Sequence, residues 1–436
     1  MTAIGTKCLQ AALALALAVA PCAARADPSR AALADTLFRA GHFAEAQAQY
    51  EAIVAGTPRD YHATLQLGRI ALLGNRFTDA ETWLQKAHAL QPGETDAQVT
   101  LAEVYYREDA FDKAAAALQG IDVDANKLIQ SQYGTLNVAK LQSFAGQTPY
   151  QVQGDGAANR VKLLQTEPLP LVSVRINGGK EVTFFIDTGG SEVALDSEFA
   201  RELGLPDYGG VKGTFSGGQQ ATVSHTRIDS LGLGAWTIRN IPAVALPLRQ
   251  LSDLAGGRTI DGLIGTTLFS HFLTTLDYPR GELVLRRSDA PVAAAGVRVP
   301  FWVAGDHFMV GWGQVETQPP SLMFVDTGLI GAGVKLGERM LKAAHVRLEK
   351  DKAETGAGAG GTLQTIPYTV RSLSFGAVRE TNVAGLYDGP FPWETLFGFY
   401  LAGMIGHDFF RPYAVTFDFR RMEIELAGAG SPPQTR

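Results

Sequence analysis

Two patterns of hydrophobic positions divide this chain of 436 residues. From about residue 28 to residue 144, apolar residues recur at the spacing of amphipathic helices, and the arrangement repeats every 34 residues, as Leu33, Leu67 and Leu101 illustrate. From about residue 160 onward, short β-branched and aromatic runs alternate with Gly, Pro, Asn and Asp turns, which is typical of β-strands. The sequence therefore predicts an all-α N-terminal region followed by an all-β region.

The three helical units match one another position by position. A small residue opposite a large one lets two antiparallel helices pack closely and the next pair stack on them, so the region resembles tetratricopeptide repeats. We expect a helical-repeat domain over residues 27–147, ending in a capping helix near residues 125–144. Such a domain binds a protein partner or substrate, or serves spacing and assembly. The equivalent turn, large and small positions are Gly41, Asn75 and Asp109, then Phe43, Phe77 and Phe111, then Ala46, Ala80 and Ala114.

The β region contains a second, longer repeat. Five matches occur in the same order and at nearly constant offset, which indicates two duplicated lobes, expected at residues 160–287 and 297–430. The segments 148–159 and 288–296 are then linkers, the first between the helical domain and the lobes and the second between the lobes. The two clearest matches are Asp187-Thr188-Gly189 with Asp326-Thr327-Gly328, 139 residues apart, and Gly265 with Gly406, 141 apart.

The repeated Asp-Thr-Gly segment is the candidate catalytic element. Each copy follows a buried-strand pattern, at residues 182–186 and 322–325. Glycine allows close approach by a neighbouring loop, and a threonine hydroxyl can donate a hydrogen bond to the opposite loop. Two carboxylates brought close together cannot both ionise cheaply, so Asp187 and Asp326 would share one proton, one acting as base and the other as acid. Loop support is assigned to Thr188, Gly189, Ser191, Thr327 and Gly328.

Residues 160–426 resemble the aspartic protease superfamily, in which each lobe contributes one Asp-Thr-Gly loop. The resemblance implies a bilobal all-β acid-protease fold and an endopeptidase that activates water between two aspartates, with no metal and no cofactor. It also implies a substrate-covering hairpin, for which Thr214, Phe215 and Ser216 are the candidates. A pepsin-like motif near the C-terminus supports the resemblance and consists of Gly406, Phe409, Arg411, Tyr413, Phe417 and Asp418.

The sequence departs from the family pattern at three places. Gly190 and Leu329 stand directly after the two Asp-Thr-Gly segments, where Ser, Thr or Ala is usual, and the candidate hairpin lacks the tyrosine of pepsin-like flaps. An alternative function is therefore a non-catalytic peptide-binding scaffold. Another is an inhibited precursor, processed within residues 146–159. In the second lobe, residues 356–361 match Gly-x-Gly-x-x-Gly, but they precede a β-like run rather than a helix and are interpreted as a mobile loop.

Composition and the N-terminus set the remaining expectations. A formal net charge of −6 offers no basic surplus for nucleic acid, so a peptide or protein substrate is expected, with a possible protein partner on the helical repeats. Residues 1–26 contain Lys7, an apolar run at 9–20 and a small-x-small site ending at Ala26, which is typical of a cleaved signal peptide. Both cysteines, Cys8 and Cys22, lie within it, so neither disulfides nor Cys-ligated metals are expected. We expect a periplasmic or secreted protein without a stable membrane span.

Overall fold

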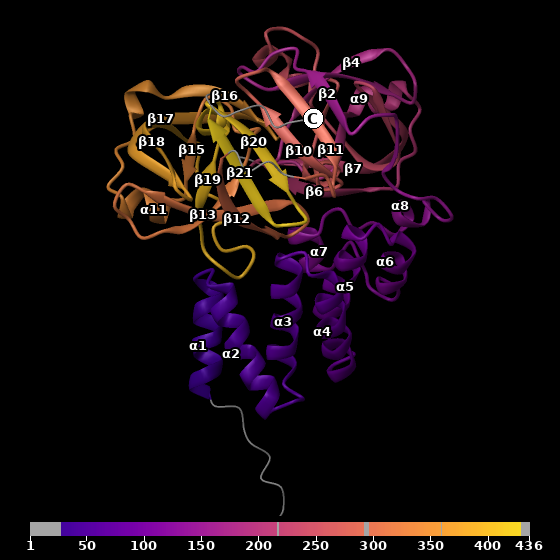
Figure 1. Ribbon diagram of the computed structural model, residues 1–436, viewed down its shortest axis with the longest axis vertical. Helices are drawn as coiled ribbons and strands as arrows, with labels where there is room; N and C mark the ends of the chain where they lie inside the picture. Colours follow the sequence, from indigo (N-terminus) through magenta and orange to yellow (C-terminus); the bar gives the residue numbers. More distant parts are fainter. Residues whose placement is uncertain (1–27, 216–217, 292–295, 359, 429–436) are drawn as a thin grey trace, which may run out of the picture.

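The computed structural model describes residues 28–215, 218–291, 296–358 and 360–428, so the predicted signal peptide lies outside the described residues. Figure 1 shows a helical region at one end of the molecule and two β-lobes at the other. The predicted fold class, a helical solenoid followed by a bilobal all-β unit, is confirmed.

Three antiparallel helical pairs form the N-terminal region, as the 34-residue period predicts. The small positions of the repeat, Ala46, Ala80 and Ala114, are fully buried where neighbouring helices pack. The helices are α1 (Pro28–Arg39), α2 (Phe43–Gly56), α3 (Tyr61–Leu73), α4 (Phe77–Leu90), α5 (Asp96–Arg107) and α6 (Phe111–Ala117).

The prediction of a single capping helix near residues 125–144 is wrong, because this segment forms two short helices, α7 (Lys127–Gln132) and α8 (Val138–Gln142). The side chain of Asn126 accepts hydrogen bonds from the amides of Leu128 and Ile129. The side chain of Asn137 accepts one from the amide of Lys140 at 2.8 Å. Each asparagine therefore caps the start of its own helix.

Each lobe contains a closed barrel of six strands, and the pairing order is the same in both. In the first lobe the order is β3-β4-β9-β5-β8-β7, with β7 pairing back to β3; in the second it is β13-β14-β19-β15-β18-β17, with β17 pairing back to β13. The first set comprises β3 (Leu171–Ile176), β4 (Glu181–Ile186), β5 (Val193–Asp196), β7 (Gln220–Leu233), β8 (Trp236–Leu246) and β9 (Gly262–Ile264). The second comprises β13 (Phe308–Val315), β14 (Ser321–Val325), β15 (Val334–Leu336), β17 (Gly361–Phe375), β18 (Val378–Tyr387) and β19 (Leu401–Ile405).

An antiparallel sheet of six strands joins the two lobes, in the order β2-β11-β10-β20-β21-β12. Its centre is the pair of Thr275 and Thr416, whose hydroxyl oxygens lie 2.8 Å apart. These threonines are 141 residues apart, so a pseudo-twofold axis that relates the lobes passes between them. The strands are β2 (Ala158–Lys162), β10 (Phe272–Asp277), β11 (Glu282–Arg287), β12 (Val297–Ala304), β20 (Tyr413–Asp418) and β21 (Glu423–Gly428).

The segment expected to be a linker at residues 148–159 is largely built into the sheets. Strand β1 (Gln151–Gln153) pairs with β8, and the indole nitrogen of Trp236 donates to the carbonyl of Asp155 at 3.0 Å. Strand β2 begins at Ala158 and pairs with β11. Of the other predicted linker, 288–296, residues 292–295 lie outside the described part of the chain.

Short elements complete the lobes. Two hairpins project from the barrels, one formed by β6 (Gly210–Thr214) with β7 and the other by β16 (Glu354–Gly358) with β17. The short helices are α9 (Ser197–Glu202), α10 (Thr266–Ser270), α11 (Glu338–Ala343) and α12 (His407–Phe410), with 3₁₀ turns at Arg249–Ala255 and Lys350–Lys352.

One edge of the helical solenoid docks on both lobes. In Figure 1, α1 to α3 lie beneath the second lobe and α5 to α8 beneath the first. The turn residues of the repeat make these contacts: Gly41 packs against Leu322, and Asp109 pairs with His271 at 3.0 Å. The solenoid therefore joins the β-unit through structurally equivalent turns.

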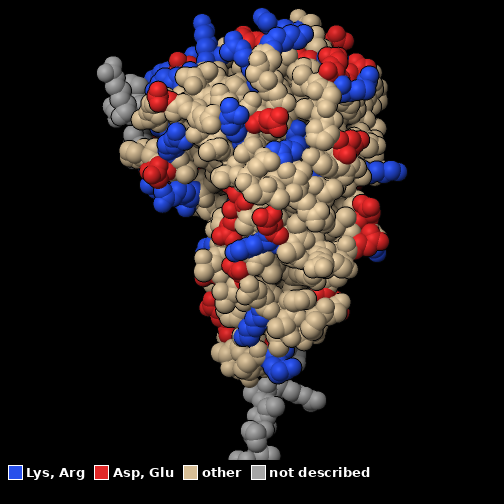
Figure 2. All heavy atoms as spheres, turned by 90° about the vertical axis from the view of Figure 1, so that its right-hand side faces the viewer, with Lys and Arg blue, Asp and Glu red and all other residues tan. Residues whose placement is uncertain are grey.

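Figure 2 shows Lys and Arg interspersed with Asp and Glu over one face of the molecule. Among the described helices, none combines the length and the apolarity that crossing a bilayer requires.

Candidate active site

Asp187 and Asp326 lie directly after strands β4 and β14, at equivalent places in the two barrels. The amide of Asp187 donates to the carbonyl of Ile264 at 3.1 Å, and the amide of Asp326 donates to the carbonyl of Ile405 at 3.0 Å. Both acceptors belong to the strand that runs parallel to the aspartate strand. The duplicated sequence thus gives the two aspartates the same backbone support.

Four hydrogen bonds cross between the two Asp-Thr-Gly loops. The hydroxyl of Thr188 accepts from the amide of Thr327 and donates to the carbonyl of Val325, both at 3.0 Å. The hydroxyl of Thr327 accepts from the amide of Thr188 at 3.0 Å and donates to the carbonyl of Ile186 at 3.5 Å. Both threonine side chains are fully buried, so these bonds join the lobes at the base of the site.

The two carboxyl groups face each other across this junction. The amides of Gly189 and Gly328 each donate to Oδ1 of the aspartate in the same loop, at 2.8 Å. A Cβ atom added to Gly189 would lie only 2.6 Å from Oδ1 of Asp326, and one added to Gly328 would collide with Oδ1 of Asp187. Glycine is therefore required at both positions, because each carboxylate lies against the opposite loop.

Burial and mutual proximity perturb the acidity of the pair. Burial, together with the negative charge of Asp326, raises the pKa of Asp187 well above its ordinary value, and the Gly189 amide opposes this shift. Burial also raises the pKa of Asp326, while the Gly328 amide, Asp187 and the charges of His307 and Lys335 act in the opposite direction. The pair is expected to share one proton over a wide range of pH, because two adjacent anions are disfavoured.

The segment after strand β9 lies against the first aspartate loop and supplies a residue that the sequence interpretation missed. The hydroxyl of Thr266 donates to the carbonyl of Thr188 at 2.9 Å, and its amide donates to the carbonyl of Gly190. A Cβ on Gly265 would collide with the carbonyl oxygen of Glu192. The sequence feature that could have identified Thr266 is its place directly after Gly265, which matches Gly406 in the second lobe.

Leu329, which departs from the family pattern, and Ser191, which is predicted to support the first loop, both contact the segment that follows the parallel strand. Leu329 is buried and packs against Gly406, and its carbonyl accepts from the amide of His407. The carbonyl of Ser191 accepts a hydrogen bond from the amide of Thr267 at 2.8 Å. Ser191, which is predicted to support the active-site loop, thus contacts the segment after β9 through its backbone.

Two hairpin tips meet at the site. Thr214 ends β6, and the Phe215 ring packs against an apolar cluster that includes Leu263, a neighbour of Gly190; Ser216, the third predicted flap residue, lies outside the described residues. Residues 356–358 and 361 are paired in the β16–β17 hairpin, so the interpretation of this segment as a loop is wrong for them; residue 359 lies outside the described residues. A Cβ on Gly360 would lie 2.5 Å from the Gln219 side chain, so this second hairpin touches the first.

A buried contact with the helical domain also lies beside the first aspartate loop. Glu192, five residues after Asp187, accepts hydrogen bonds from Nζ of Lys140 at 2.7 and 2.8 Å and from the hydroxyl of Tyr106. The Lys140 and Glu192 side chains are both fully buried. No local pattern in the sequence marked this pair. Within the described part of the chain, no group of three or more His, Cys, Asp or Glu side chains is arranged to bind a metal ion.

Thr188→Val should destabilise the protein by about 1–3 kcal/mol, because the buried amide of Thr327 loses its acceptor. The measurement is the free energy of unfolding from denaturant titration. Thr82→Val is the matched control, since the Thr82 hydroxyl is exposed and donates to the carbonyl of Thr78 in its own helix. Equal stabilities of the two variants would contradict the structural role of the crossing hydrogen bonds.

Asp187→Asn should raise the melting temperature at neutral pH, by roughly 2 °C or more. The folded-state pKa of Asp187 lies above its ordinary value of 3.8, so the stability that depends on its proton is complete below about that pH and is lost as the pH rises through the folded-state pKa. Asparagine removes the charge and keeps an acceptor for the Gly189 amide. The melting temperature of Asp187→Asn should therefore fall less steeply between pH 3 and pH 8 than that of the control Asp253→Asn, which changes an exposed carboxylate. Identical slopes for the two variants would contradict the raised pKa of Asp187.

Comparisons with known families agree with this geometry. Residues 172–268 match the aspartyl protease family, which covers most of the first lobe, and residues 31–95 and 71–136 match two tetratricopeptide repeat families. No curated protein matches the chain. The second lobe has the strand order of the first, although the family match ends before it. The chain thus contains an aspartyl protease domain that is preceded by tetratricopeptide repeats.

Proposed function

We propose that this protein is an aspartic endopeptidase that hydrolyses peptide bonds with water activated between Asp187 and Asp326. One observation carries the proposal: two carboxyl groups with raised pKa values face each other on loops joined by the Thr188 and Thr327 hydrogen bonds. Such a pair holds one acid and one base within reach of the same water molecule.

In the proposed mechanism, the ionised aspartate takes a proton from water as the water oxygen attacks the peptide carbonyl carbon. The protonated aspartate donates a hydrogen bond to the carbonyl oxygen and stabilises the charge that develops there. The peptide nitrogen then receives a proton from the pair, and the carbon–nitrogen bond breaks. The pair ends with one proton, as it began, and no covalent intermediate forms.

The two hairpins would cover a bound peptide. The tip of the first carries Phe215, and the second meets it at Gly360. A cover of this kind excludes water from the reacting groups and strengthens their electrostatic interactions. Phe215 has no hydrogen-bonding side chain, so it would contribute apolar contact only.

Export to the periplasm or the exterior belongs to the same proposal and is supported by the signal-peptide pattern of residues 1–26. The helical repeats would bind a protein partner or part of the substrate on surfaces that the β-lobes leave uncovered. Tetratricopeptide repeats commonly mediate such contacts through the face that their stacked helices form.

Asp187→Asn and Asp326→Asn should each lower the rate of peptide cleavage by at least about 10²–10⁴-fold, because each removes one partner of the acid–base pair. The assay is cleavage of a peptide library between pH 3 and pH 8. Asp253→Asn, which changes an exposed carboxylate, should retain activity.

Undiminished cleavage by both aspartate variants would contradict the proposal. A folded protein that cleaves no library peptide, and that does not bind a transition-state analogue with a secondary hydroxyl, would favour the non-catalytic peptide-binding scaffold instead.

A further inference from the structure

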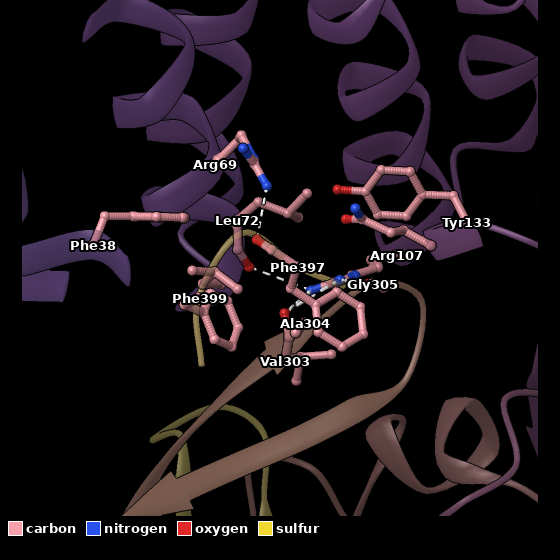
Figure 3. A pocket seen from close by; sticks show the side chains of 12 residues that line it. Phe38, Arg69, Leu72, Arg107, Tyr133, Val303, Ala304, Gly305, Phe397 and Phe399 are labelled. Carbon is pink, nitrogen blue, oxygen red and sulfur yellow. Dashed lines mark hydrogen bonds between the residues drawn. The ribbon is translucent and has the colours of Figure 1, made fainter. Parts of the chain in front are cut away.

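The pocket between the helices and the second lobe illustrates how buried charges are satisfied in this protein. In Figure 3, Arg69 donates to the carbonyl of Phe397 at 3.0 Å, and Arg107 donates to the carbonyl of Val303 at 3.4 Å. A buried polar group without a partner is costly, so a native structure that keeps one calls for an explanation. His407 is such a group, because its side chain is fully buried and its Nε2 atom makes no hydrogen bond within the described part of the chain.

His407 and Thr266 occupy equivalent places in the two lobes. Each follows the glycine that comes after the strand parallel to the aspartate strand. The amide of Thr266 donates to the carbonyl of Gly190 at 2.9 Å, and the amide of His407 donates to that of Leu329 at 3.2 Å. Gly190 and Leu329 directly follow the two Asp-Thr-Gly segments. The backbone hydrogen bonds therefore align Thr266 with His407.

In the first lobe, the side chain at this place supports the aspartate loop. The hydroxyl of Thr266 donates to the carbonyl of Thr188 at 2.9 Å. In the second lobe the corresponding carbonyl belongs to Thr327, and the backbone of Thr327, like that of Thr166, raises the pKa of His407. A carbonyl group has this effect when it lies close enough to accept a hydrogen bond from the ring. The imidazole thus faces the second aspartate loop as the hydroxyl faces the first.

The surroundings of the ring favour its neutral form. Burial lowers the pKa of His407 to about 4, and the charge of Arg411 acts in the same direction. Glu167 and the carbonyl groups of Thr166 and Thr327 oppose this shift but do not reverse it. The imidazole therefore carries no charge at neutral pH.

Tyr278 determines which ring nitrogen carries the proton. Its hydroxyl lies 3.3 Å from Nδ1 of His407, and the two rings meet edge to face with their centroids 5.1 Å apart. Burial, together with the negative charges of Asp326 and Asp408, raises the pKa of Tyr278, so the hydroxyl keeps its proton and can donate it to Nδ1. The proton of the neutral ring then lies on Nε2, which provides a donor for a carbonyl of the aspartate loop.

We propose that neutral His407 is a positioning residue for Asp326 and supports the second aspartate loop as Thr266 supports the first. The inference rests on the proposed peptidase function, to which it adds a titratable group that does not touch the substrate. A hydroxyl supports its loop at any pH, whereas the imidazole does so only while it is neutral. Protonation adds a hydrogen at Nδ1, opposite the Tyr278 hydroxyl, and places a costly buried charge beside the loop. The two lobes therefore respond differently to acid.

The first test compares His407→Leu, which removes both ring nitrogens, with His407→Gln, which keeps an uncharged donor and acceptor. The measurements are kcat and KM for one peptide at neutral pH. We expect His407→Leu to lower kcat roughly 10–100-fold with little change in KM, because a displaced reacting group slows the chemical step without weakening substrate binding. His407→Gln should recover most of this loss. It should also retain a larger share of its activity than the unaltered protein as the pH falls toward about 4, because glutamine gains no proton.

His225→Leu is the matched control. His225 is also a buried histidine whose ring makes no hydrogen bond among the described residues, but it lies in β7, outside both aspartate loops. Its replacement should leave kcat unchanged. An unchanged kcat in His407→Leu, or failure of His407→Gln both to recover activity and to alter its decline in acid, would overturn the inference.

A second measurement needs no catalysis. In protein labelled with ¹³C at its aspartate carboxyl carbons, the signal of Asp326, identified by its loss in Asp326→Asn, reports the pH at which this carboxyl group titrates. We expect His407→Leu to shift the titration and His407→Gln to return it toward that of the unaltered protein. Identical titration curves for the three proteins would overturn the inference. A protein that shows the shift but cleaves no peptide would count against the peptidase function alone.

Discussion

The crossing hydrogen bonds of Thr188 and Thr327 are the constraint on which the site depends. Two carboxylates repel each other, and each would be better solvated alone in water than beside the other in a half-buried site. The two threonines oppose this separation, since each satisfies a buried amide and a buried carbonyl of the opposite loop. The loops therefore cannot part without leaving polar groups unpaired, and the electrostatic repulsion appears as raised pKa values instead of as movement.

The rest of the β-unit maintains this junction. Each aspartate strand is one of six in a closed barrel, so its end is fixed on both sides by neighbouring strands. The interlobe sheet then sets the distance between the barrels, with Thr275 and Thr416 at its centre. Because the lobes are duplicated, Asp187 and Asp326 occupy the same place in each barrel, directly after an equivalent strand. The pseudo-twofold axis then brings the two carboxyl groups face to face.

The helical repeats break this symmetry. They contact both lobes, the first through Glu192 and the second through the β12–β13 turn. A domain that the sequence presents as a separate module is thus packed against both β-lobes.

The sequence by itself determined the features that repeat or that depend on neighbouring residues. The 34-residue period predicted the helical pairs, and the paired Asp-Thr-Gly segments predicted the lobes, Asp187 and Asp326. It did not reveal the β16–β17 hairpin, because glycine-rich residues there carry little strand propensity and are ordered by pairing across the hairpin. Nor did it reveal the Lys140–Glu192 pair, whose partners are 52 residues apart in different domains. Only the tertiary structure decided such contacts, since burial of a charge depends on which distant surface covers it.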